Sequence, residues 1–151
     1  MTAHSSALCR GRYSEPGMVY LITTVTEDRS AVFANFELAR LVIAELRACD
    51  ECRRSQTLAF VLMPDHLHWL VQLQKGDLST LVGQFKANAA KVVNRRQDAV
   101  GVTLWQHGFH DQALRREEDL AAVARYVVRN PVRAGLVRKT GDYPHWDAIW
   151  L

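Results

Sequence analysis

The stretch that decides the fold is FVLMPDHLHWLVQL, residues 60–73. Its two halves are apolar runs, and the Pro64-Asp65 pair between them is typical of a tight turn. Side chains on a strand alternate between its two faces, so residues two positions apart point the same way. His66 and His68 are therefore expected side by side on one face of a hairpin. Two neighbouring imidazoles are costly to bury, and they are natural ligands for a metal ion.

The segments around this hairpin have the periodicities of helices and strands. The expected elements are, in order, a strand at 18–26, a helix from the N-cap Asn35 to the CDECRR segment (49–54), strands at 57–63 and 66–73, a helix from the N-cap Asp77 to about Arg96, a strand at 102–106 and a helix at 117–130. Helical geometry is disfavoured before a proline, so Pro131 predicts that the last helix ends at Asn130.

The order β-α-β-β-α-β with one further helix is typical of the ferredoxin-like split β-α-β fold. We therefore expect an α+β protein with an antiparallel four-stranded sheet, helices on one side and an additional C-terminal helix. The first and third strands would be central. The chain of 151 residues has the size of a single domain (1–151), and its aromatic tail, residues 138–151, is expected to pack on the body.

The composition is that of an ordinary globular protein, with 48% hydrophobic and 23% charged residues. No apolar run approaches the roughly 18 residues of a membrane span, and the first residues do not resemble a signal peptide. Three cysteines are an odd number, which favours free thiols in a reducing compartment. A cytoplasmic protein without a membrane partner is expected.

Positive charge is concentrated in the second half of the chain. Residues 86–139 hold eleven Lys and Arg against five Asp and Glu, whereas residues 1–85 hold eight against nine. This clustering favours an anionic partner, of which nucleic acid is the commonest. A solvated basic surface would produce the same pattern.

Cys49 and Cys52 form a C-x-x-C pair that could join His66 and His68 in a zinc site. The spacing argues against this, because zinc fingers separate their histidines by three to five residues and only one residue lies between these two. The cysteines also fall near the end of the first expected helix. Free thiols are therefore favoured over zinc or redox roles.

Three longer segments follow one another along the chain: MPDHLHWLV (63–71), WQHGFHDQALR (105–115) and YVVRNPVRAGLV (126–137). Together they resemble the REP-associated tyrosine transposases, a branch of the single-tyrosine HUH nucleases, where HUH denotes His, a hydrophobic residue and His. The segments GRYSEPGMVYLITTVTEDRSAVF (11–33) and GDYPHWDAIWL (141–151) are also similar to that family. The resemblance implies a nucleoid-associated enzyme that cleaves and rejoins single-stranded DNA at repetitive extragenic palindromic (REP) hairpins.

The resemblance also implies roles for individual residues. Tyr126 matches the nucleophile, which would form a covalent 5′-phosphotyrosine. His66 and His68 match the metal ligands, and two imidazoles leave room for phosphate and water. Asn130, one helical turn after Tyr126, would complete the shell of a Mg²⁺ or Mn²⁺ ion. Ligand chemistry alone leans towards Mn²⁺ or Zn²⁺.

Further residues are candidates for contacts with DNA. The basic candidates are Lys86, Lys91 and Arg95 on the second helix, and Arg129 and Arg133 beside Tyr126. Trp105, Trp146 and Trp150 could stack on unpaired bases or could be buried. His107 and His110 stand where the family more often has Arg and Tyr, which leaves contacts there open. Asp65 could orient a histidine or serve only as a turn residue.

Several alternatives stay open at this point. The histidine pair could be an accident of a core or surface strand, with Tyr126 resting its ring on the sheet. The protein could be a non-catalytic regulator that binds DNA hairpins. It could also be a metal-dependent hydrolase in which water attacks the phosphate. A monomer and a homodimer are both compatible with the resemblance.

Overall fold

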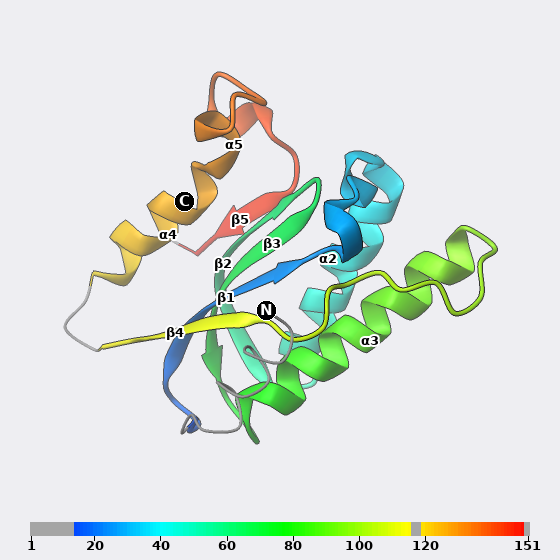
Figure 1. Cartoon of the computed structure of the whole chain (residues 1–151). Coiled ribbons are helices and arrows are strands. Elements are labelled where there is room, and N and C mark those ends of the chain that lie inside the picture. Colours follow the sequence, from blue (N-terminus) through cyan, green and yellow to red (C-terminus); the bar gives the residue numbers. More distant parts are fainter. Residues whose placement is uncertain (1–13, 116–118, 150–151) are drawn as a thin grey trace.

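The computed structural model describes residues 14–115 and 119–149. Its centre is a five-stranded antiparallel sheet with the strand order β4-β1-β3-β2-β5 (Figure 1). The strands are β1 Val19–Val25, β2 Ser55–Met63, β3 His66–Leu73, β4 His110–Leu114 and β5 Trp146–Ala148. The expected α+β fold and the central first and third strands are confirmed, with one strand more than the four predicted.

Helices lie on both faces of this sheet. They are α2 Phe36–Glu51, α3 Leu78–Arg96, α4 Leu120–Val128 and α5 Asn130–Arg133, with three 3₁₀ turns, η1 Glu27–Arg29, η2 Val32–Ala34 and η3 Thr140–Asp142. α2 and α3 pack side by side on one face, and α4 lies against β2, β3 and β5 on the other (Figure 1). No helix in the described ranges is long and apolar enough to cross a membrane.

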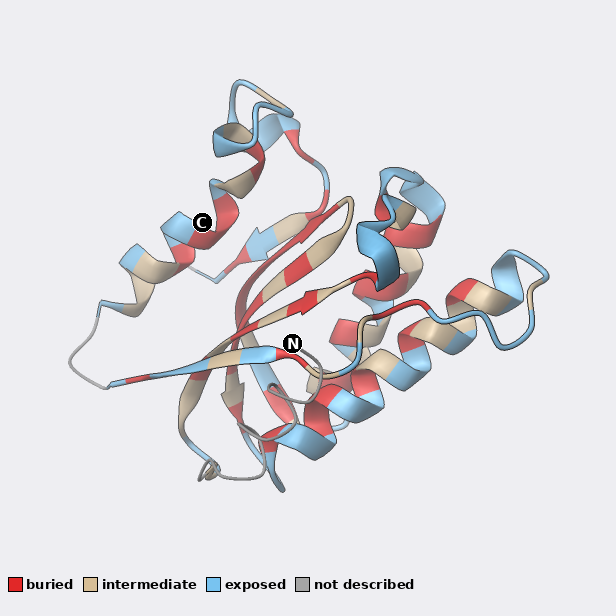
Figure 2. Ribbon diagram, viewed as in Figure 1, coloured by how far each residue is buried: buried red, intermediate tan, exposed pale blue. Residues whose placement is uncertain are grey.

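Each face of the sheet has its own hydrophobic core. On β3, Trp69 belongs to the core beneath α2 and α3, whereas its neighbour Leu70 belongs to the core beneath α4, together with Val127. Figure 2 shows the buried residues along the central strands and on the inner sides of the helices. Because His66 and His68 alternate in phase with Leu70, both lie on the α4 face.

The starts of α2 and α3 follow the sequence signals. The side chain of Asn35 accepts a hydrogen bond from the backbone N–H of Leu38 (3.0 Å), and that of Asp77 accepts one from Thr80 (2.8 Å). Such a cap stabilises a helix by about 1 kcal/mol. Both predicted N-caps are confirmed.

The strand expected at 102–106 is wrong. Within this described segment, Trp105 alone forms a bridge, to Thr26, and the fourth strand is the more polar β4. Trp105 leaves the strand pattern because its ring is buried in the core, with centroids 5.5 Å from Phe33 and 6.0 Å from Phe85. β4 can be polar because an edge strand with a solvated face needs little apolar surface.

The last predicted helix differs at both ends. α4 begins after Asp119, whose carboxylate caps it, and ends at Val128, whereas residues 116–118 lie outside the described part of the chain. We predicted that Asn130 would leave helical geometry, but it is the first residue of α5. Pro131 stands in the first turn of that helix, where no backbone N–H is required.

The C-terminal segment lies along β2, and its strand β5 pairs with the edge of that strand. The backbone N–H of Leu62 donates to the carbonyl of His145 (2.9 Å), and the Tyr143 hydroxyl donates to the carbonyl of Leu62 (2.6 Å). These bonds attach the segment beside the end of β2 that leads into the histidine hairpin.

Candidate functional site

Two imidazoles stand at the start of the central strand. His66 and His68 are half-buried, and their ring centroids are 4.8 Å apart in an edge-to-face arrangement. Val25 and Thr23 of β1 lie opposite them. The predicted alternation of side chains along this strand is confirmed. It places both rings on the α4 face, where they contact each other.

Each histidine has its Nδ1 atom engaged. His66 Nδ1 lies 2.7 Å from the carboxylate of Asp65, and His68 Nδ1 lies 3.0 Å from the hydroxyl of Thr23. Burial alone would raise the pKa of Asp65, but the hydrogen bond and charge of His66 and the charge of Arg29 hold it below its ordinary value. The Nε2 atoms are then the nitrogens that can reach a ligand.

His68 is held in its neutral form. Burial lowers the pKa of His68 to about 4, and the charges of His66 and Arg133 act in the same direction. A histidine must be neutral to bind a metal ion. The charge of Arg133 on α5 is thus felt by His68 on β3.

Tyr126 lies on α4 and is 62% exposed, so its ring does not pack on the sheet. The guanidinium of Arg133 lies over this ring, 3.9 Å from its centroid. The charge of Arg133 also lowers the pKa of His68, so the same cation acts on a side chain of α4 and on one of β3.

Asn130 is half-buried at the start of α5. Its side-chain Nδ2 donates a hydrogen bond to the carbonyl of Val127 at 2.8 Å. This bond engages the nitrogen of the amide and leaves Oδ1 as the atom that can face a cation. An oxygen donor is what the predicted metal role of Asn130 requires.

Imidazole nitrogens, as in His66 and His68, and an amide oxygen, as in Asn130, are donor types that divalent metal ions accept. Within the ranges that the structure describes, no group of three or more His, Cys, Asp and Glu side chains could hold a metal. A metal site with only two imidazole ligands keeps open positions for phosphate and water.

The basic candidates fall into two groups. Arg129 and Arg133 are exposed near Tyr126, at the junction of α4 and α5. Lys91 and Arg95 are exposed on α3, which covers the opposite face of the sheet from the histidines. Contacts of α3 with DNA would thus use a surface separate from the histidine pair.

Lys86, a candidate for a DNA contact, has its ammonium group engaged within the protein. It is half-buried, and its ammonium group donates hydrogen bonds to the backbone carbonyls of Gln106 and Gly108. These bonds tie α3 to the loop that precedes β4. The side chain of Lys86 therefore supports the fold.

The tryptophans do not form stacking surfaces in the described part of the chain. Trp105 is buried in the core, and Trp146 packs on the second core while its indole N–H donates to the carbonyl of Thr140 (2.9 Å). Trp150 lies outside the described residues. Trp105 and Trp146 therefore follow the alternative in which these aromatic rings pack in the protein rather than stack on bases.

Cys49 and Cys52 do not share a site with His66 and His68. Cys49 is buried on the inner side of α2, where burial raises the pKa of its thiol to about 11, and Cys52 is exposed. Because α2 covers the face opposite His66 and His68, the zinc alternative is excluded by topology.

The sheet register adds a neighbour whose role the sequence left open. Thr23 lies opposite His68 on one side and His110 on the other. Opposed residues of antiparallel strands share a face, so the exposed His110 is on the histidine face, two strands or about 10 Å from His68. The sequence of β4, HDQAL, has no alternation of polar and apolar residues, so periodicity could not have located His110.

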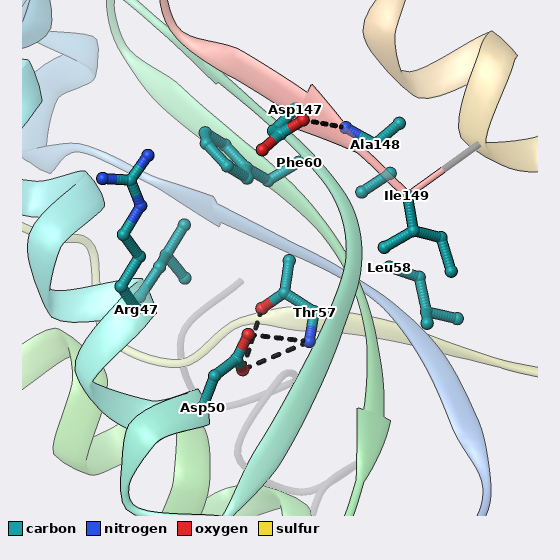
Figure 3. Close-up of a pocket in the computed structure, with 10 residues that line it drawn as sticks. Arg47, Asp50, Thr57, Leu58, Phe60, Asp147, Ala148 and Ile149 are labelled. Atoms are coloured by element: carbon teal, nitrogen blue, oxygen red, sulfur yellow. Dashed lines mark hydrogen bonds between the residues drawn. The ribbon is translucent and has the colours of Figure 1, made fainter. Parts of the chain in front are cut away.

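A pocket of about 140 Å³ lies at the β5 edge, between α2, β2 and β5 (Figure 3). Inside it, the carboxylate of Asp50 accepts hydrogen bonds from the backbone N–H and the hydroxyl of Thr57, each at 3.1 Å. This carboxylate thus accepts from a backbone N–H of β2 just beyond the residues that pair with β5. None of the predicted site residues lines the pocket.

Comparison with known sequences shows similarity to transposases. A family model described as IS200-like transposase matches residues 15–130. A protein of Haemophilus influenzae classed with the REP-associated tyrosine transposases is 28% identical over 139 residues, covering 85% of this chain and 78% of the relative. The REP-associated tyrosine transposase of Escherichia coli K12 is 24% identical over 137 residues, covering 89% and 78%.

Two solved structures share the fold. One is a REP-associated tyrosine transposase bound to a REP hairpin, with a TM-score of 0.67, 24% identity, and coverage of 89% of this chain and 79% of that chain. The other is a crystal structure from Deinococcus radiodurans assigned as a transposase, with a TM-score of 0.55, 21% identity, and coverage of 78% and 93%. At these identities the likeness establishes the fold alone.

Proposed function

Because this chain belongs to the family of IS200-like transposases, we propose that it is a single-tyrosine DNA endonuclease and strand transferase that uses a divalent metal ion. Its proposed substrate is single-stranded DNA with REP-type hairpins. Two relatives are classed as REP-associated tyrosine transposases, and a solved relative holds a REP hairpin, which supports this choice. The resemblance recognised in the sequence is confirmed at the level of the family.

One arrangement carries the proposal. The guanidinium of Arg133 stacks on Tyr126 and acts electrostatically on His68, so one cation acts on both the proposed nucleophile and a proposed metal ligand. The exposure of Tyr126 disfavours the alternative in which its ring merely packs on the sheet. An exposed phenol beside a fixed cation is suited to meet a phosphate.

In the proposed reaction, the phenolic oxygen of Tyr126 attacks the phosphorus of the scissile phosphodiester. The bond from the tyrosine oxygen to phosphorus forms as the bond to the 3′-oxygen breaks. The phenol loses its proton, and the departing 3′-oxygen gains one. The products are a 5′-phosphotyrosine and a free 3′-hydroxyl, and attack by a 3′-hydroxyl on the phosphotyrosine rejoins the DNA without a further co-reactant.

The other residues would hold the phosphate and its charge. A divalent ion held by Nε2 of His66, Nε2 of His68 and Oδ1 of Asn130 would polarise the scissile phosphate. Arg133 provides a fixed positive charge beside the attacking oxygen. Arg129 is proposed to bind an adjacent phosphate of the same strand.

The test uses end-labelled, single-stranded REP-type hairpin DNA with Mn²⁺. Wild-type protein is compared with Tyr126→Phe, and with Tyr143→Phe as a matched loss of a hydroxyl elsewhere. Products are separated on a denaturing gel with and without protease digestion. We expect a slow, protease-sensitive adduct with the wild type and with Tyr143→Phe, and none with Tyr126→Phe.

Two other outcomes would each replace the proposed mechanism. Hairpin binding by the wild type without an adduct would favour the non-catalytic regulator. Cleavage that survives Tyr126→Phe would mean that water is the nucleophile and that the protein is a hydrolase. Because Tyr126 is exposed, the Phe variant is expected to unfold at the same temperature as the wild type, which excludes misfolding as the cause.

A further inference from the structure

The turn before His66 is held in place by the strand end of β1. Thr26, which is fully buried, donates from its backbone N–H to the carbonyl of Asp65 (2.9 Å), while its hydroxyl proton is shared between the carbonyls of Ser30 (2.8 Å) and Asp65 (3.1 Å). The backbone N–H of Phe33 donates to the carbonyl of Pro64 (3.0 Å). These bonds fix the backbone of Asp65, and with it the point from which the Asp65 carboxylate extends.

The two carboxylate oxygens of Asp65 are divided between two partners. Oδ1 accepts from His66 Nδ1 at 2.7 Å. Oδ2 accepts from both Nε and Nη2 of Arg29, each at 3.1 Å. Asp65 thus connects an arginine of η1 to an imidazole of β3, two residues that are far apart in the sequence.

Arg29 reaches this carboxylate from a strained turn. Asp28 and Arg29 have φ values of 55° and 50°, in the left-handed region that costs a residue with a side chain about 1–2 kcal/mol. Strain of this kind persists where the surroundings over-determine the conformation. In the described part of the chain, the contact that engages the Arg29 side chain is the one with Asp65.

We propose that Asp65 is a positioning residue that fixes the tautomer and the orientation of His66, and that Arg29 is the counter-ion that holds the Asp65 carboxylate. A carboxylate at this distance accepts a proton-bearing Nδ1, which leaves the lone pair of His66 on Nε2, directed away from the turn. The inference rests on the proposed function, because it assigns His66 to a metal ion.

The first measurement needs no metal and no DNA. Long-range ¹H–¹⁵N correlation spectra of the histidine-labelled apo-protein report which ring nitrogen of His66 carries the proton. We expect the Nδ1-protonated tautomer in the wild type and a shift towards Nε2 protonation in Asp65→Ala. Asp65→Asn retains an acceptor oxygen, so this conservative variant should restore the wild-type tautomer.

The second measurement is the Mn²⁺ affinity of the same proteins, read by electron paramagnetic resonance. Loss of an outer-shell partner typically weakens metal binding about 10–100-fold, which is the drop expected for Asp65→Ala. Arg29→Gln should give a smaller drop, because the bond between Asp65 and His66 is kept. Arg53→Gln and Asp98→Asn are matched controls, since both residues are exposed and have left-handed φ values of 59° and 54°.

The outcomes separate this inference from the proposed function. An unchanged His66 tautomer in Asp65→Ala, with Mn²⁺ affinity within twofold of the wild type, would overturn the inference and leave the nuclease proposal intact. A wild type that does not bind Mn²⁺ would instead overturn the metal site itself, and with it the ligand role of His66. Should Asp65→Ala not fold, Arg29→Gln decides, and affinity equal to that of Arg53→Gln would refute the inference.

Discussion

The guanidinium of Arg133 covers the ring of Tyr126, with its carbon 3.9 Å from the ring centroid. A contact of this type contributes about 0.5–1 kcal/mol at an exposed site, enough to bias the orientation of a phenol that is 62% exposed. The two residues belong to different helices, so the break between α4 and α5 sets the position of the cation relative to the nucleophile.

Removing this cation should affect cleavage more than DNA binding. Arg133→Met is expected to lower the single-turnover cleavage rate about 100-fold or more, because a positioned charge near the reacting phosphate is lost. Arg125→Met is the control, since Arg125 is an exposed arginine of α4 that lies 3.9 Å from the carboxylate of Asp119. Equal rates for the two variants would remove Arg133 from the mechanism.

Asn130 should respond differently to two substitutions. Asn130→Ala removes the amide oxygen and should weaken Mn²⁺ binding at least about tenfold, whereas Asn130→Asp supplies a carboxylate and should strengthen it. The matched control is Asn94→Ala, because Asn94 also donates from Nδ2 to a backbone carbonyl, that of Val102 (3.0 Å). Calorimetric titration with Mn²⁺ measures the affinities, and a weaker Asp variant would contradict an oxygen-ligand role.

The lysines of α3 should separate into a structural and a DNA-binding class. Lys86→Met is expected to lower the free energy of unfolding by about 1.5–3 kcal/mol, because charged hydrogen bonds to Gln106 and Gly108 are lost. Lys91→Gln should leave stability unchanged but reduce the salt dependence of hairpin binding by about 0.7–0.9 in the logarithmic slope. Urea unfolding and binding titrations at several salt concentrations measure the two effects.

His145 should make the protein less stable in mild acid. Burial, with the charge of Arg40, lowers the pKa of His145 below 6.5, so the unfolded chain binds the proton more readily. The stability associated with neutral His145 is then complete above pH 6.5 and is lost as the pH falls below that value. His68 acts in the same direction, so the comparison with His145→Phe isolates His145.

The measurement is urea unfolding of both proteins at pH 7.5 and pH 5.5. We expect the wild type to lose more stability between these values than His145→Phe. The Phe side chain can replace the ring contacts with Phe36 and Tyr143 without a buried Nδ1 that lacks a partner in the described structure. An identical pH dependence of the two proteins would show that His145 is not responsible.

The two cysteines of α2 should differ in reactivity. Burial raises the pKa of Cys49 to about 11 and shields its sulfur, whereas Cys52 is exposed. Iodoacetamide at pH 8 is therefore expected to label Cys52 in the native protein and Cys49 only after unfolding, as read by peptide mass spectrometry. Labelling of both at similar rates would mean that α2 opens readily.

Local patterns were sufficient for much of the fold. The alternation of β3 placed His66 and His68 on one face, and the short polar side chains of Asn35 and Asp77 marked the helix starts, because each depends only on neighbours within a few residues. The spacing of the two histidines and the motif around Tyr126 were also sufficient to recognise the family. These features need no knowledge of what the chain packs against.

Errors arose where burial overrode a local pattern. The segment around Trp105 has the composition of a strand, yet its ring gains more by entering the core, and the polar β4 takes the edge position. Lys86 has the helical phase of an exposed residue, but its ammonium group bonds to carbonyls of a loop about twenty residues away. Neither partner is visible in the periodicity of the segment itself.

The sequence by itself determined most of the elements, the shared face of the histidines and the family, because strand alternation, helix capping and motif spacing are short-range properties. Only the tertiary structure decided that α4 lies on the histidine face, that Arg133 covers the Tyr126 ring and also acts on His68, and that Arg29 holds the carboxylate beside His66. These relationships join residues that are distant in the chain, and they are set by how the two apolar faces of one sheet are buried.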